Sequence, residues 1–245
     1  MEVINKLECY LINLDRSPDR LLQMQKRLEK MQLPFRRVSA VDGKQVVFTD
    51  KEIDASKYEK YHGKYVTSTE IACYISHYDV LTLFLESDKE YALILEDDME
   101  FCDDFMSILG ELLSLHNDWD MVKLNGTRSW ACPITKKNLS NNYQLVLNLL
   151  HQAKSGAYLV NRKAAESLVK NLLPMTVPYD HEFIKFWKYN IRLFSVRPFP
   201  TWEVGEASTI DYVGIKKNKK PWYKRGSTLV YRTTITLKRL LYALQ

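Results

Sequence analysis

No uninterrupted apolar run in this 245-residue chain, such as that from Tyr91 to Leu95, is longer than five residues. A helix that spans a bilayer needs about 20 apolar residues, so the sequence predicts no transmembrane helix. A short apolar run bounded by polar residues is instead typical of a strand that is buried on both faces of a sheet. The chain is therefore expected to fold around short buried strands that other elements cover.

Strand-like and helix-like patterns alternate along the chain. Apolar runs predict strands at 9–14, 35–41, 91–95, 121–124, 156–160 and 191–196. Helical spacing of apolar residues predicts helices at 18–33, 68–87, 104–116, 161–172 and 180–189. The polar segment 46–65 is expected to be a mobile loop. This alternation predicts an α/β fold with a mostly parallel central sheet flanked by helices.

Charge divides the chain into a nearly neutral body and a basic tail. Residues 205–245 contain nine Lys and Arg against Glu206 and Asp211, whereas the remainder contains 26 basic and 28 acidic residues. We expect one folded domain, residues 1–205, followed by a basic C-terminal tail, residues 206–245. The neutral body offers no basic groove, so no nucleic-acid partner is expected unless the basic run 216–225 recruits one.

The tail combines basic residues with interfacial aromatics and an amphipathic segment. Trp222 and Tyr223 lie within the basic run, and leucines recur at helical spacing between Leu237 and Leu244. This combination suits an anionic membrane surface, where each Lys or Arg contributes about 1 kcal/mol. The alternative is a solvated loop and a terminal helix packed on the body, although the threonines at 233, 234 and 236 weaken the helical pattern.

The N-terminus and the cysteines favour a cytoplasmic protein. Residues 1–6 have neither a basic region nor a small-residue cleavage site, so secretion by a signal peptide is not expected. The four cysteines are 29 to 64 residues apart, which fits neither a zinc knuckle nor a disulfide scaffold. We expect reduced thiols in a protein at the inner face of the cytoplasmic membrane. The sequence does not indicate an oligomeric state.

Three carboxylates, Glu96, Asp97 and Asp98, follow the apolar run directly. On an extended chain Glu96 and Asp98 share one face and Asp97 points to the other. Ligands of open α/β sheets bind at the carboxyl ends of strands, and converging carboxylates repel each other unless a cation lies between them. Oxygen ligands favour Mg²⁺ or Mn²⁺. The alternative is a solvated acidic turn before the helix at 104–116.

Five sequence blocks carry a resemblance to a known family: YLINLDRSPDR at 10–20, RVSAVDG at 37–43, STEIACYISH at 68–77, ALILEDD at 92–98 and SGAYLV at 155–160. In this order they resemble glycosyltransferase family 25, the bacterial lipooligosaccharide galactosyltransferases and their relatives. The resemblance implies a GT-A type fold with a nucleotide-binding N-terminal half, a uridine diphosphate hexose donor and inversion at the anomeric carbon. Thr69 and Ala72 stand where the family usually has Gly, which leaves the donor sugar open.

The resemblance and the strand geometry together assign the acidic triplet, a motif of the DXD type, to the donor. Asp98 is expected to hold the Mn²⁺ or Mg²⁺ ion that bridges the two phosphates. Glu96 would share this ion through water or hold the ribose, and Asp97 would orient its neighbours. His181 is an alternative metal ligand, as a late His is in some GT-A enzymes.

The first strand, loop and helix are expected to form the nucleotide wall, because the strand's carboxyl end and the helix N-terminus face one cleft. Asn13 would contact the base, and Asp15, Arg16 and Arg20 complete the wall, with Arg16 as the favoured phosphate ligand. Alternatively, Arg20 pairs with Asp15 or Asp19.

Polar residues of the helix at 68–87 are further candidates. Glu70, Cys73 and His77 lie on one stripe of this helix. Glu70 and His77 are candidate donor contacts. The alternatives are a helix cap formed with Thr67 for Glu70 and a core histidine for His77.

A general base must take the proton of the acceptor hydroxyl. The resemblance places a family-typical Asp at Asp180, and Glu182 and Glu206 are alternates. Asp180 could instead be only an N-cap residue. The residue patterns leave this choice open.

Three classes of function remain. The leading one is a metal-dependent transferase that moves a hexose, galactose by resemblance, to a lipid-linked lipooligosaccharide or lipopolysaccharide acceptor. A glucosyltransferase or another hexosyltransferase of the same fold is an alternative donor assignment. The others are a non-catalytic module that binds a nucleotide sugar and a nucleic-acid partner recruited through the tail.

Overall fold

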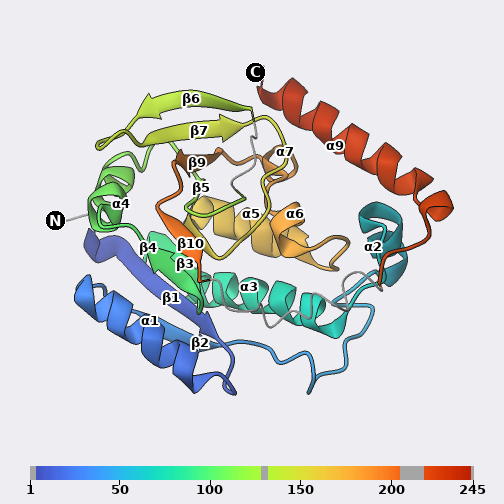
Figure 1. Ribbon diagram of the computed structural model, residues 1–245, viewed down its shortest axis with the longest axis horizontal. Helices are drawn as coiled ribbons and strands as arrows, with labels where there is room; N and C mark the ends of the chain where they lie inside the picture. The colour runs from blue at the N-terminus through green and yellow to red at the C-terminus, as the bar shows by residue number, and fades with distance from the viewer. Residues whose placement is uncertain (1–3, 128–131, 205–217, 244–245) are drawn as a thin grey trace.

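A sheet of eight strands runs through the part of the chain that the computed structural model describes, residues 4–127, 132–204 and 218–243 (Figure 1). Its order is β2-β1-β3-β8-β5-β9-β7-β6. In chain order these strands are β1 (Leu7–Asn13), β2 (Arg36–Ser39), β3 (Tyr91–Glu96), β5 (Met121–Lys123), β6 (Pro133–Asn138), β7 (Gln144–Asn148), β8 (Ala157–Asn161) and β9 (Leu193–Arg197). A separate antiparallel pair joins β4 (Met99–Phe101) to β10 (Thr201–Glu203).

The sheet is mixed, so the prediction of a mostly parallel sheet was wrong. Strand β1 runs parallel to β2 and β3, and β5 runs parallel to β9. Strand β8 lies antiparallel between β3 and β5, and β7 is antiparallel to both β6 and β9. Helices cover both faces, so a central strand is apolar throughout in either direction. The apolar runs therefore revealed the strands and not their directions.

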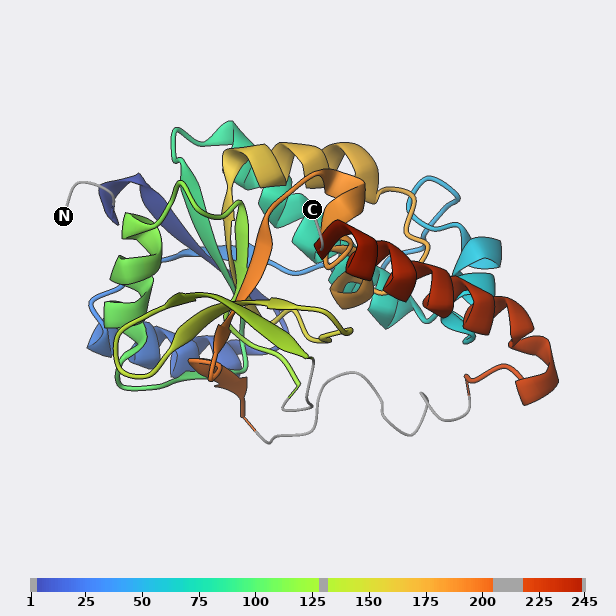
Figure 2. The same ribbon diagram turned by 90° about the horizontal axis from the view of Figure 1, so that it is seen from above.

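Helices cover the two faces of the sheet, with α3 (Ser68–Glu86) and α5 (Arg162–Leu172) on one and α1 (Pro18–Lys30) and α4 (Phe105–Ser114) on the other (Figure 2). Alternate strand residues point to opposite faces. Tyr10 and Ile94 join the core under α3 and α5, whereas Leu11 and Leu95 join the core under α1 and α4. The sequence predicted all four helices.

The helix starts follow local signals where these are strong. Thr67 and Glu70 form the predicted capping box at the start of α3. The segment expected to be a loop contains α2 (Ala55–His62), of which only Tyr58 and His62 are buried. So few inward residues give no recognisable apolar stripe. The helix predicted at 180–189 is two short helices, α6 (Tyr179–Glu182) and α7 (Phe186–Tyr189).

The described part of the C-terminal tail packs on the body. A short 3-10 turn, Trp222–Lys224, precedes α9 (Gly226–Ala243), which lies along α2 and α7 (Figure 1). Tyr231 stacks on Tyr61 of α2 with ring centroids 4.2 Å apart, and the buried Arg239 lies over the Trp187 ring at 5.6 Å. This is the arrangement of a terminal helix packed on the body.

The threonines of α9 explain why its pattern was weak. The hydroxyls of Thr233, Thr234 and Thr236 each donate to the carbonyl four residues earlier, at 2.9 to 3.0 Å. These bonds satisfy the hydroxyls within the helix. Glu206 and the basic residues Lys216 and Lys217 lie outside the described residues.

Among the helices within 4–127, 132–204 and 218–243, none is long and apolar enough to cross a membrane. All four cysteines fall in these ranges, and each is a free thiol.

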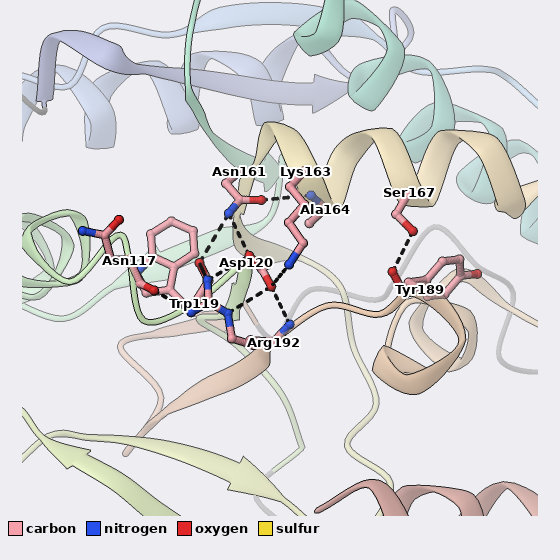
Figure 3. Close-up of polar contacts among 9 residues, drawn as sticks. All are labelled: Asn117, Trp119, Asp120, Asn161, Lys163, Ala164, Ser167, Tyr189 and Arg192. Atoms are coloured by element: carbon pink, nitrogen blue, oxygen red, sulfur yellow. Dashed lines mark hydrogen bonds and ion pairs between the residues drawn. The ribbon is translucent and has the colours of Figure 1, made fainter. Parts of the chain in front are cut away.

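The buried carboxylate of Asp120 links several elements at the edge of the sheet opposite the carboxyl ends of β1 and β3. Asp120, only 1% exposed, accepts hydrogen bonds from Arg192, from Lys163 and from Asn161 at 2.8 to 3.2 Å (Figure 3). Burial by itself raises the pKa of Asp120, but these donors outweigh it and hold the pKa well below its usual range. Asp120 therefore joins the starts of β5, α5 and β9.

Asp120→Asn should lower the free energy of unfolding by about 2 kcal/mol near neutral pH, because it removes charge-assisted hydrogen bonds from Arg192 and Lys163, whose own charges stay partly exposed to water. The wild-type contribution is complete above about pH 4, where an unfolded Asp is ionised, and falls as pH drops towards the lower native pKa. The difference between variant and wild type should therefore shrink in acid.

Urea titrations of both proteins near pH 7 and below about pH 4 measure this difference. The control is Asp118→Asn, which removes an exposed pair with Lys137 and should change stability by less than about 1 kcal/mol. Equal effects of the two substitutions would contradict the role given to Asp120.

Candidate functional site

A cavity opens at the carboxyl ends of the parallel strands β1 and β3, with an empty volume of about 750 Å³ when the open solvent at its entrance is included. Its other walls are the N-terminal half of α3 and the loop that follows β2. Six of the predicted site residues line the cavity: Arg16, Arg20, His77, Glu96, Asp97 and Asp98. The cavity thus lies in the N-terminal half of the chain, at the strand ends where the sequence predicts a ligand site.

The chain turns within the acidic triplet, at the carboxyl end of β3. The strand ends at Glu96, and Asp97 and Asp98 form a turn before β4, so the expected alternation of faces does not continue and all three carboxylates line the cavity. Arg20 of α1 bridges two of them, at 2.8 Å from Asp97 and 3.2 Å from Asp98. The alternative pairing of Arg20 with Asp15 or Asp19 is not what the structure contains.

The carboxylate of Asp98 is only partly bonded. Among the described residues none bonds its buried Oδ1 atom, while Oδ2 accepts from Arg20. Burial, followed by the negative charge of Glu96, raises the pKa of Asp98 to about 7. An unpartnered buried carboxylate oxygen costs free energy. Asp98 is therefore the group of the triplet that a bound cation would stabilise most.

Asn13 is buried beneath the triplet and is not among the described residues that line the cavity. Because Ile12 pairs with Glu96 across the parallel strands, the next residues on each strand are neighbours. The Asn13 amide donates to Asp97 at 2.7 Å and to the carbonyl of Ser17 at 3.1 Å, and Arg37 donates to its Oδ1. Asn13 thus fixes Asp97 and the turn into α1.

Asp15 is not among the described residues that line the cavity. Its side chain is 72% exposed, forms an ion pair with Arg37, and accepts a hydrogen bond from Ser39 at 2.8 Å. These partners lie on β2 at the edge of the sheet. Asp15 therefore stabilises the loop after β1 through its contacts with β2.

Arg16 lines the cavity and pairs with Asp42 in the loop after β2. The next residue, Gly43, lies against the start of α3, where an added Cβ would lie 2.4 Å from the carbonyl oxygen of Ser68. No other residue fits so close to backbone. The loop is thus held directly against α3.

The start of α3 forms the wall where the chain departs from the resemblance. Thr69 and Ala72, the two positions where Gly was expected, both line the cavity, together with Cys73 and Ser76. Glu70 does not: it completes the capping box with Thr67 and accepts a hydrogen bond from Tyr58 at 3.0 Å. The capping alternative describes its contacts.

His77 and Glu96 meet on the floor of the cavity, with His77 Nε2 lying 3.3 Å from Glu96 Oε1. Ser155 donates to the same oxygen at 3.2 Å. Burial raises the pKa of Glu96, but these two neighbours outweigh it and leave the pKa below its usual value. His77 Nδ1 lies 3.1 Å from the Tyr158 hydroxyl, and the ring stacks on Tyr179 with centroids 4.2 Å apart.

Asp180 is the second residue of α6 and, like Asn13, is not among the described residues that line the cavity. It accepts a hydrogen bond from the backbone N–H of Lys154 at 3.0 Å. Burial raises its pKa, but His181 and this N–H outweigh the effect and lower it. Asp180 is thus ionised at neutral pH, as a general base must be.

A buried lysine holds the loop beside Asp180. Lys123 donates to the carbonyls of Gln152, Ala153 and Lys154 at 2.7, 3.2 and 2.6 Å. Burial lowers the pKa of Lys123 to about 7. All three ammonium donors have backbone acceptors, which fixes the 152–154 backbone.

His181 and Glu182 lie elsewhere. The His181 ring contacts those of His62 and His151 at centroid distances of 5.0 and 4.2 Å, and neither His181 nor Glu182 is among the described cavity-lining residues. Glu182 is buried and paired with Lys185 and Lys188 at 2.6 and 2.7 Å. These pairs satisfy it within α6 and α7.

The residues that sequence reasoning missed are Asp42, Ser155, Tyr158 and Lys123. The first three fall within the blocks that carried the resemblance, so position in a block was an available signal. Lys123 had no such signal, because nothing in the sequence around an isolated lysine at a strand end indicates that it is buried.

Comparisons with known proteins agree with these blocks. Procollagen galactosyltransferase 1 of Danio rerio is 24% identical over 229 residues, which is 83% of this chain and 38% of that protein. The probable inactive glycosyltransferase 25 family member 3 of Rattus norvegicus is 24% identical over 245 residues, 91% of this chain and 42% of that protein. The chain spans about two fifths of the length of these curated relatives.

Among solved structures, A197 from STIV aligns with a TM-score of 0.41 and 11% identity over 77% of this chain and 80% of that chain. Residues 6–183 match glycosyltransferase family 25 (LPS biosynthesis protein), a range that includes every described residue of the cavity. The chain belongs to glycosyltransferase family 25.

Proposed function

We propose that this chain is a metal-dependent, inverting hexosyltransferase with a GT-A type fold. It would move a hexose from a uridine diphosphate sugar to a lipooligosaccharide or lipopolysaccharide acceptor, and galactose is the first candidate for that hexose. The observation that carries the proposal is the acidic end of β3, which lines a cavity and in which no described residue bonds the buried Oδ1 of Asp98. The family and its galactosyltransferase relatives support a nucleotide-sugar donor.

The nucleotide would lie along β1, with its diphosphate towards Arg16 and Arg20. Both guanidinium groups line the cavity and now face carboxylates, Asp42 for Arg16 and Asp97 and Asp98 for Arg20. A guanidinium binds a phosphate with the same paired geometry as a carboxylate. Phosphate oxygens could therefore take over part of these contacts when the donor enters.

The residues at the end of β3 fit a hard divalent cation. Asp98 supplies a free carboxylate oxygen and Glu96 a second carboxylate, which are the donors that Mn²⁺ and Mg²⁺ prefer. Such an ion would neutralise the diphosphate charge that develops as the nucleotide leaves. Asp97, held by Asn13 and Arg20, orients the turn from which Asp98 projects.

Asp98→Asn should abolish transfer and weaken Mn²⁺-dependent binding of uridine diphosphate at least about tenfold, since even outer-shell substitutions cost that much. The fold should persist, because the substitution removes a buried carboxylate that has a raised pKa. Calorimetric titration of nucleotide with and without Mn²⁺ measures the effect.

The control for this experiment is Asp103→Asn, an exposed acid beyond β4, which should bind nucleotide as the wild type does. If Asp98→Asn keeps Mn²⁺-dependent binding and near-normal turnover, the metal assignment is wrong.

Asp180 is the proposed general base. Its carboxylate would take the proton of the acceptor hydroxyl while the hydroxyl oxygen bonds to the anomeric carbon and the bond to the diphosphate breaks. Among the described hydrogen bonds, the Asp180 carboxylate accepts one, from the backbone N–H of Lys154 to Oδ2. This bond fixes the carboxylate. Glu182 is a weaker candidate because two lysines neutralise it.

Asp180→Asn should lower turnover by about 10²–10⁴-fold and flatten the acidic limb of its pH profile, with donor affinity retained. Asn can still accept the Lys154 N–H, so the loop should keep its position. Steady-state rates across pH, together with nucleotide titrations, measure both quantities. A collapse of donor affinity would instead assign Asp180 to the donor site.

A lipid-linked acceptor would bring the protein to the anionic inner face of the cytoplasmic membrane. Exposed apolar residues lie on the outer side of α9 and on the turn before it: Trp222, Tyr223, Leu229, Val230, Leu237 and Leu241. Exposed basic residues accompany them at Lys219, Lys224, Arg232 and Lys238. Basic residues beside interfacial aromatics suit anionic headgroups.

Trp222→Ser should weaken binding to phosphatidylglycerol-rich vesicles about tenfold, since burying one large side chain contributes roughly 1.5 kcal/mol or more. Val47→Ser is the matched control, because Val47 is 92% exposed on the body and Trp222 is 83% exposed. Co-sedimentation measures both, and equal binding by the two variants would contradict the membrane role of this surface.

A non-catalytic module that binds a nucleotide sugar is the second candidate, because some matched relatives are described as inactive. The acidic triplet and Asp180 favour turnover in this chain. A thermal-shift panel of nucleotide sugars with and without Mn²⁺ identifies the donor, including glucose or another hexose. Release of nucleotide after acceptor is added distinguishes transfer from binding.

A further inference from the structure

Three side chains of different chemistry converge on one wall of the cavity. Cys73 and His77 lie one turn apart on α3, and Glu96 ends the neighbouring strand β3. Their ligand atoms, Cys73 Sγ, a ring nitrogen of His77 and a carboxylate oxygen of Glu96, all lie within 4.8 Å of one another. These three side chains, on one helix and one strand, lie close enough for a single metal ion to bind all of them.

The imidazole and the carboxylate are already oriented by groups outside the trio. His77 Nδ1 lies against the Tyr158 hydroxyl at 3.1 Å, which leaves Nε2 for the Glu96 side. The ring is only 1% exposed and stacks on Tyr179 with an interplanar angle of 3°. Ser155 holds Glu96 at 3.2 Å. Metal-binding histidines commonly use such a partner on their second nitrogen.

The donor set selects a softer cation than the one proposed at Asp98. A thiolate, an imidazole and a carboxylate are together typical ligands of Zn²⁺, whereas Mn²⁺ and Mg²⁺ favour oxygen ligands. All three residues line the cavity, so a fourth position would face its open space. Three protein ligands and one open position describe an exchangeable zinc site.

We propose that Cys73, His77 and Glu96 form a second metal site, which binds Zn²⁺ or a similar borderline transition-metal ion inside the nucleotide-sugar cavity. Binding releases the thiol proton of Cys73 to solvent, and the thiolate, imidazole and carboxylate coordinate the ion. This binding does not depend on the proposed transferase activity.

The consequence for activity does rest on the proposed function. Glu96 contributes to both sites, so Zn²⁺ would remove one of the carboxylates beside Asp98 and occupy space at the cavity floor. Zn²⁺ should therefore inhibit nucleotide binding that depends on Mn²⁺. Regulation by zinc availability would follow from residues within the site itself.

Co²⁺ is the probe for the site, because cobalt bound to thiolate gives a ligand-to-metal charge-transfer absorption in the near ultraviolet. The full chain should bind one equivalent of Co²⁺ with this absorption, and one equivalent of Zn²⁺ should remove it. Cys73→Ser should lose the absorption and bind Zn²⁺ at least about tenfold more weakly.

Cys102→Ser is the matched control, since Cys102 contacts Tyr143 outside the cavity and should leave the absorption unchanged. X-ray absorption of the zinc-loaded wild type needs no variant and should show one sulfur at about 2.3 Å with nitrogen and oxygen at about 2.0 Å. Absence of sulfur ligation, or an absorption that persists in Cys73→Ser, overturns the proposal.

Asp98→Asn separates this proposal from the proposed function. The variant should keep the cobalt absorption while it loses nucleotide binding dependent on Mn²⁺. If the wild type shows the cobalt absorption but no Mn²⁺-dependent nucleotide binding, the zinc site stands and the transferase proposal fails. The reverse pattern removes the zinc site and leaves the transferase proposal intact.

Discussion

The concentration of negative charge at the end of β3 is the constraint on which the site depends. Three carboxylates lie at the end of this buried strand: Glu96 is bonded by His77 and Ser155, Asp97 by Asn13 and Arg20, and Asp98 by Arg20 as well. Like charges this close destabilise a fold unless cations or donors compensate them. Arg20 supplies the positive charge within the chain, and it comes from α1, so the first helix must pack against β3 for the triplet to be tolerated.

The layers of the fold could be predicted because they rest on local periodicity. The strands β1, β3 and β8 are continuous apolar runs, and α3 carries both a capping box and an apolar stripe. The orientation of β8 could not be predicted, since a strand that is buried on both faces has the same apolar pattern in either direction. The exposed strand β6 and the polar helix α2 also lacked a signal, because tertiary contacts and not amphipathicity hold them in place.

The candidate site was predicted to the level of elements and not of contacts. Sequence reasoning brought β1, β3 and α3 to one cleft, and Arg16, His77 and the acidic triplet do line it. It could not reveal that Asn13 lies beneath the carboxylates or that Glu182 is neutralised by neighbouring lysines. These outcomes depend on side-chain directions at distances of a few ångströms, which turns and helix ends determine.

The three carbonyl contacts of Lys123 have a consequence for how the site moves. The segment they hold carries the Lys154 N–H that binds Asp180 and leads directly to the Ser155 hydroxyl that binds Glu96. A displacement of this backbone therefore shifts both carboxylates at once, one on the donor side and the other at the start of α6. The interior ammonium thereby couples the position of Glu96 in the cavity to that of Asp180 in α6, although it makes no described hydrogen bond to either carboxylate.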